Sequence, residues 1–122
     1  MPRAAASPIL SEEAIDLVAR RFRALADPNR LRILNALMQG EHSVGDLAAL
    51  AGLEQPSVSR HLAVLRQAGI VSRRAQGNRG FYRIEDPTVI RLCEVVCGGL
   101  VERLAEDLEA LPDARAWRGA QL

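Results

Sequence analysis

Apolar residues recur at helical spacing through the first third of the chain. Residues 11–26 place them on one face, and a second such stretch runs from Pro28 until Gly40. Ser11 and Asp27 precede the two stretches as N-caps, and proline is tolerated in a first helical turn because its missing N–H has no partner there. The pattern therefore predicts two helices.

Two shorter apolar stretches follow, separated by a glycine turn. Ser43 begins the first as in a capping box, and Gly52 ends it. The second opens at Gln55–Pro56 and closes before Gly69. Its apolar residues share one face: Val58, Leu62 and Leu65. A short helix, a turn and a second helix over residues 43–69 predict a helix-turn-helix.

The apolar period changes after Gly69. Residues 70–74 and 81–84 are short strand candidates, and the stretch between them holds the glycine and asparagine residues that suit a hairpin wing over residues 70–84. A long helix is expected over residues 87–111. Its apolar stripe comprises Cys93, Cys97, Leu100, Leu104, Leu108 and Leu111. The fold class is therefore mainly α with a small β-hairpin, a winged helix-turn-helix in the order α-α-α-α-β-β-α.

Composition agrees with one helical domain. Of the 122 residues 48% are hydrophobic but only 3% are aromatic, so the core is aliphatic. We expect one domain over residues 11–111, flanked by flexible ends at 1–10 and 112–122. No apolar run resembles a membrane span or a signal peptide, so we expect a soluble, cytoplasmic protein without membrane contact.

Charge is divided unevenly along the chain, although the net charge is only +1. Residues 55–83 contain no acid but six arginines: Arg60, Arg66, Arg73, Arg74, Arg79 and Arg83. Residues 85–113 contain eight acids and two arginines. A merely solvated surface would intersperse the two signs, so this division indicates a face that binds a polyanion.

Four segments resemble regulators of the ArsR/SmtB family. Residues 25–34 are similar to the opening signature of that family, residues 55–62 and 65–71 to its recognition helix and wing entry, and residues 77–84 to its wing. They follow the family's order and spacing. The resemblance implies a homodimer that represses a promoter until an inducer binds.

The implied dimer pairs through the first and last helices. A last helix of about 25 residues presents more apolar surface than one small core can cover, which agrees with this pairing. We place the interface at Val18, Phe22, Val96, Leu100 and Leu104. The implied partner is double-stranded DNA with a pseudo-palindromic operator, because a two-fold dimer presents two recognition helices.

The outward side of the 55–69 helix carries the candidate base contacts. A step of about 100° per residue places Ser57, Arg60 and Val64 away from the apolar face, with Ser59 and His61 on the flanks. Arg60 can bond guanine bidentately, and the resemblance implies that both serines and His61 also face the groove. A packing role for His61 stays open.

Arginines of the wing are expected at backbone phosphate or in the minor groove. Ser43 is explained equally well as part of a phosphate-binding helix N-terminus or as a plain cap. The candidate DNA contacts are Ser43, Gln55, Ser57, Ser59, Arg60, His61, Arg66, Arg73, Arg74 and Arg79.

Two metal sites of the family are absent here. The cysteine pair of one site is replaced by Ser43 and Gly45. The two histidines of a zinc site on the last helix are replaced by Thr88 and Gly99, and the remaining carboxylates alone hold zinc poorly.

Cys93 and Cys97 are the remaining candidate sensors. At positions i and i+4 they share a helix face, too far apart for an unstrained disulfide. They suit a soft metal or metalloid ion, or redox and reactive-sulfur chemistry. They also suit a structural role as small buried hydrophobes. All three interpretations stay open, and no other cofactor is expected.

An enzyme is not expected. Both histidines lie in or beside the helix-turn-helix, and no phosphate loop or nucleophile elbow occurs. A thiol peroxidase using Cys93 is the one enzymatic alternative. Two non-enzymatic functions also stay open, namely a regulator without thiol sensing and an adaptor that binds protein through the winged fold.

Overall fold

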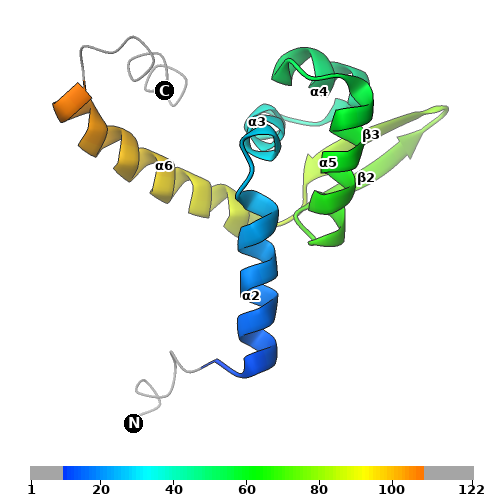
Figure 1. Ribbon diagram of the computed structural model, residues 1–122. Coiled ribbons are helices and arrows are strands. Elements are labelled where there is room, and N and C mark those ends of the chain that lie inside the picture. The colour runs from blue at the N-terminus through cyan, green and yellow to red at the C-terminus, as the bar shows by residue number, and fades with distance from the viewer. Residues whose placement is uncertain (1–9, 109–122) are drawn as a thin grey trace. The chain divides into compact units, whose positions relative to one another are not determined.

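The computed structural model describes residues 10–108, in which five helices and one three-stranded antiparallel sheet occur (Figure 1). The chain divides into two compact units, Met1–Glu85 and Asp86–Leu122. Most of the two expected flexible ends, and positions 109–111 of the expected last helix, lie outside the described residues. None of the helices within the described range is long and apolar enough to cross a membrane.

The first two predicted helices are confirmed. Helix α2 (Glu12–Leu25) begins after Ser11, whose Oγ accepts a backbone N–H at 3.1 Å. Helix α3 (Pro28–Leu37) begins after Asp27, whose carboxylate accepts two backbone N–H groups at 2.9 and 3.1 Å. These bonds stabilise the ionised carboxylate and lower its pKa. Helix α3 ends sooner than predicted, three residues before Gly40.

The helix-turn-helix is also confirmed. Helix α4 (Val44–Ala51) begins after Ser43, and Gly52 ends it at φ 70°, a left-handed conformation that glycine adopts without a steric penalty. Helix α5 (Gln55–Gln67) follows with proline in its first turn. The turn between the helices is short, so the positions of α4 and α5 are closely linked.

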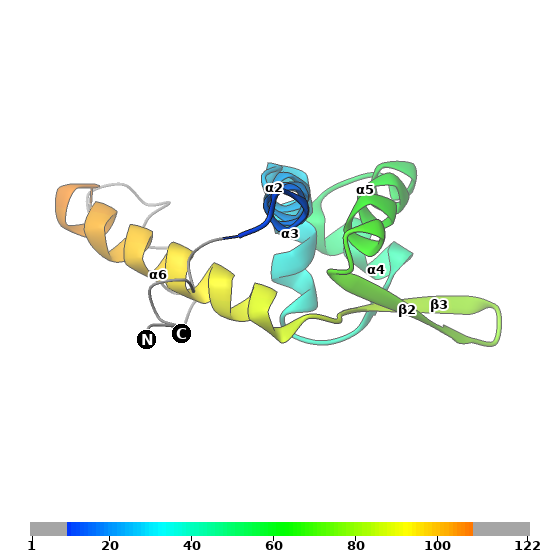
Figure 2. The same cartoon turned by 90° about the horizontal axis from the view of Figure 1, so that it is seen from below.

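The wing strands are longer than predicted. Strand β2 (Val71–Gln76) and strand β3 (Arg79–Ile84) extend past the expected ranges 70–74 and 81–84, leaving a turn of only two residues. Gly77 starts this turn at φ 62°, as a type II′ hairpin requires. The hairpin reaches beyond α4 and α5 (Figure 2).

A third strand was not predicted. Strand β1 (His42–Ser43) pairs with β3, so that the sheet order is β1-β3-β2. Ser43 lies opposite Phe81 in this pairing and also precedes α4. The start of the helix-turn-helix is therefore hydrogen-bonded to the wing.

The core of the first unit is aliphatic. Eight side chains are at most 2% exposed: Ile33, Leu34, Leu47, Val58, Leu62, Leu65, Ile70 and Val71. Full burial of one such side chain contributes about 1.5–3 kcal/mol. Three of the eight form the predicted inward face of α5, and their burial fixes which face of α5 stays outside.

Helix α6 (Pro87–Leu108) carries an exposed apolar stripe. Val96, Leu100 and Leu104 are exposed, and Cys93 and Cys97 are half-buried on the same side. In the first unit, Val18 and Phe22 of α2 are exposed as well. Large apolar side chains that remain in water on a helix face favour association.

We expect a second copy of the chain to cover the α6 stripe. Leu100, 52% exposed, lies on the stripe, whereas Val95, 73% exposed, lies roughly 140° around the helix from it. Leu100→Glu should dissociate the dimer, because burying an unpaired carboxylate costs several kcal/mol. Val95→Glu introduces the same charge and should leave the dimer intact. Sedimentation equilibrium distinguishes the two, and a dimeric Leu100→Glu variant would place the interface elsewhere.

Candidate nucleic-acid interface

The exposed ridge of α5 is the centre of the candidate interface. Arg60 and Val64 are exposed as predicted, but Ser57 is half-buried. Ser59, predicted on the flank, is exposed. Since Arg60 lies opposite the buried face, its guanidinium is free to enter a groove of the duplex.

His61 lies against an arginine of α3. Its Nδ1 is 3.3 Å from Nη1 of Arg30. The same guanidinium donates to the backbone carbonyls of Ala24 at 2.6 Å and Arg23 at 3.2 Å, which are unpaired acceptors at the end of α2. His61 therefore contacts a structural arginine, which favours the packing interpretation.

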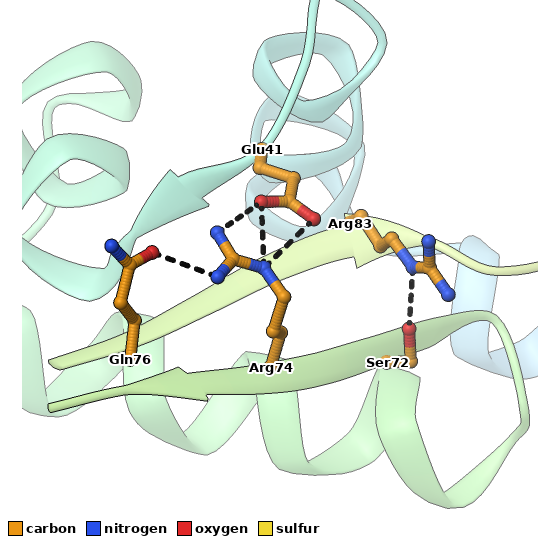
Figure 3. Close-up of polar contacts among 5 residues, drawn as sticks. All are labelled: Glu41, Ser72, Arg74, Gln76 and Arg83. Carbon is orange, nitrogen blue, oxygen red and sulfur yellow. Dashed lines mark hydrogen bonds and ion pairs between the residues drawn. The ribbon is translucent and has the colours of Figure 1, made fainter.

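Arg74 is held within the protein (Figure 3). Its Nη2 lies 2.8 Å from Oε1 of Glu41, and its Nη1 donates to Oε1 of Gln76 at 2.8 Å. The bond from Arg74 lowers the pKa of Glu41 below its usual value. A nearby bond joins Nε of Arg83 to Oγ of Ser72 at 3.2 Å. Arg74 is therefore less available to DNA than the sequence suggested.

Arg79 and Ser43 are in contact. Ser43 is only 7% exposed, and its Oγ accepts both the Asp46 backbone N–H at 3.2 Å and Nη2 of Arg79 at 3.3 Å. The guanidinium carbon of Arg79 lies 5.1 Å from the ring centroid of Phe81, as does that of Arg74. The Ser43 hydroxyl thus acts as a cap, while the exposed Arg79 lies beside the start of α4.

Two clefts open on the wing side of α5. One, of about 410 Å³, brings together four predicted site residues, Ser43, Gln55, Arg73 and Arg79. The other, of about 290 Å³, brings together Ser59 and Arg66 with Tyr82 of the wing. Arg60 lines neither cleft and remains on the ridge.

Two residues of the larger cleft were missed in the sequence. Gly45, in the first turn of α4, and Asn78, in the wing turn, both line it. A β-carbon at Gly45 would lie 3.6 Å from the side-chain nitrogen of Gln55, so glycine keeps this helix start open. The signal was present as a glycine directly after a cap.

No group of three or more metal-binding side chains occurs within residues 10–108. Cys93 and Cys97 are free thiols, both half-buried. Burial raises the pKa of Cys93, and the neighbouring Cys97 and Glu94 raise it further. A raised pKa keeps Cys93 protonated, which is the opposite of an activated thiolate.

A capped helix pair, an exposed arginine on the second helix and an arginine-bearing hairpin define a winged helix-turn-helix DNA-binding protein. The sequence profile of the bacterial regulatory protein arsR family matches residues 27–73. The chain is 39% identical to the uncharacterised HTH-type transcriptional regulator Rv0081 of Mycobacterium tuberculosis, over 87% of this chain and 94% of the relative. It belongs to the arsR family of transcriptional regulators and is not an enzyme.

Solved structures agree with this assignment. The solution structure of the homodimeric winged helix-turn-helix domain of Mycobacterium bovis Mb0332 matches with a TM-score of 0.73 and 36% identity, covering 80% of this chain and 93% of that one. The crystal structure of Rv0081 matches with a TM-score of 0.71 and 38% identity, over 80% and 99%. Among sequence relatives, the probable mercury resistance operon repressor of Streptomyces lividans is 44% identical over 63% of this chain and 62% of its own length.

The Glu41–Arg74 pair should weaken DNA binding. Glu41→Gln removes an anion and releases Arg74 toward phosphate, so it should tighten binding to a duplex selected by the wild type from a random pool, measured by fluorescence anisotropy. The gain should vanish in the double variant Glu41→Gln/Arg74→Gln, compared with Arg74→Gln alone. An equal gain in both backgrounds would mean that Glu41 acts only by general repulsion.

Proposed function

We propose that the protein is a homodimeric repressor that binds a pseudo-palindromic operator and leaves it when an inducer binds. The exposed Arg60 ridge of α5, with arginine-bearing clefts beside it, carries this proposal. Two relatives support it, since one is a probable operon repressor and the other a homodimeric DNA-binding domain. The repressor would act in the cytoplasm, where bacterial DNA lies.

The contacts fall into two classes. Arg60 on the ridge reads a base, because a guanidinium can donate two bonds to guanine in the major groove. Gln55, Arg73 and Arg79 in the larger cleft position the duplex through its phosphates. Ser59 and Arg66 in the smaller cleft extend that backbone contact. In a two-fold dimer the two α5 helices then read half-sites about one helical turn apart.

Arg60→Ala and Arg79→Ala should differ in kind. Arg60→Ala should lose about 1–3 kcal/mol on the selected duplex and relax specificity at one position in each half-site. Arg79→Ala should weaken binding to all sequences alike and flatten the salt dependence by about one unit per contact. Anisotropy titrations on selected and scrambled duplexes at several salt concentrations measure both. Equal, sequence-independent losses would remove the distinction.

As a second element we propose that Cys93 and Cys97 form the inducer switch. They are free, half-buried and one helical turn apart on the exposed stripe of α6. If α6 pairs with α6 of a second copy, four thiols approach one another. An ion held there would bias the dimer and hence the spacing of the two α5 helices.

The raised pKa of Cys93 favours a soft ion over redox chemistry. A redox or reactive-sulfur sensor needs a thiolate at neutral pH, which burial opposes here. A soft metal or metalloid can displace the thiol protons on binding, so that affinity rises with pH. A preference of about 1.4 kcal/mol for the released form already changes operator occupancy tenfold.

Cys93→Ser and Cys97→Ser should leave DNA affinity nearly unchanged and abolish release by a soft ion. Operator-bound wild type and both variants would be titrated anaerobically with arsenite, cadmium and polysulfide. Arsenite or cadmium should release the wild type, and more effectively at pH 8 than at pH 6.5. Release by polysulfide alone would favour reactive-sulfur sensing, and release of the double variant would leave both cysteines with a structural role.

A further inference from the structure

A third cleft lies on the other flank of α5, away from the wing. Its volume is about 370 Å³, and it opens between α5, the last two turns of α2 and the start of α3. Three arginines line it, Arg20, Arg23 and Arg30, together with Val64 and Gln67 of α5. None of these arginines was among the residues predicted to contact DNA.

Two of the three guanidiniums have no partner in the described part of the chain. Arg30 is held by carbonyls at the end of α2 and lies beside His61. Arg20 and Arg23 are exposed, and neither side chain forms a hydrogen bond or an ion pair with any residue from 10 to 108. Asp16, one turn before Arg20, does not neutralise it through an ion pair there. Two free cations thus share a concave surface.

The arginines flank the ridge that enters DNA. Val64 and Gln67 face the α2-side cleft, while Ser59, Arg66 and again Gln67 face the wing-side cleft. The ridge of α5 therefore has a basic cleft on each side. An α-helix with its side chains is about 10–12 Å wide and the major groove about 12 Å. When the ridge fills the groove, one sugar-phosphate strand must run along each flank.

We infer that Arg20 and Arg23 of α2 bind phosphates of the strand opposite the wing. The inference rests on the proposed DNA-binding function and adds α2 to the surface that contacts DNA. It assigns the two strands to different elements, the wing-side strand to Arg73 and Arg79 and the other strand to α2. Because the contacts are charge pairs with phosphate, they are independent of base sequence.

The opposite face of α2 leaves these arginines accessible. Val18 and Phe22, the exposed apolar residues assigned to the dimer, lie roughly 100–160° around the helix from Arg20 and Arg23. A second copy packed on that apolar face would leave the basic face open. One helix can therefore contact the partner copy and the duplex at the same time.

The test uses the variant Arg20→Gln/Arg23→Gln of the full chain and the duplex selected by the wild type. Arg32→Gln serves as the control, since Arg32 is an exposed arginine of the neighbouring helix α3 that lines none of the three clefts. The salt slope of binding should fall by about 0.9 for each phosphate contact removed, and by less in the control. Phosphate-ethylation interference locates the lost contacts on each strand.

Wild type should show interfering phosphates on both strands at each half-site, and the double variant should lose one strand's group and keep the other. Retention of both groups would overturn the inference, even if the salt slope falls, because a general charge effect would explain it. A wild type that binds no duplex would instead refute the proposed function. Circular dichroism and the dimer mass confirm that each variant is folded.

Discussion

The one-sided burial of α5 is the constraint on which the interface depends. Val58, Leu62 and Leu65 are at most 1% exposed, and they pack into the same aliphatic core as residues of α3 and α4. Rotating α5 by one residue would expose such a side chain and bury a polar one, at a cost of several kcal/mol. The orientation of Arg60 is therefore a consequence of the core, so stability and recognition are selected together.

The wing is fixed to that helix pair through a two-residue strand. The pairing of β1 with β3 places Ser43 opposite Phe81, and the Ser43 hydroxyl both caps α4 and accepts a bond from Arg79. Arg74 is tied to Glu41 at the entry to β1. These contacts hold an exposed hairpin close to α4 and α5, which gives the clefts between them a defined shape before any DNA is bound.

The sequence predicted the features whose causes are local. Caps such as Asp27, and the apolar period of α5, lie within a few residues of the elements they define, and these elements were predicted correctly. The partners of the site residues were not predictable in this way. His61 meets Arg30 and Arg74 meets Glu41 across 31 and 33 positions, and such contacts depend on tertiary packing. The two-residue β1 is too short to show any period.

The same limit explains why the α2 arginines were not predicted to contact DNA. In the sequence Arg20 and Arg23 belong to a helix whose clearest pattern is its apolar face, and only packing against α5 shows that they share a cleft with the ridge. With the dimer face on one side and the basic face on the other, α2 is a rigid link between the two proposed contacts. A change in dimer packing that rotates α2 would move its arginines relative to the second strand. An inducer acting at the dimer would then loosen DNA through phosphate contacts, without altering the residues that read bases.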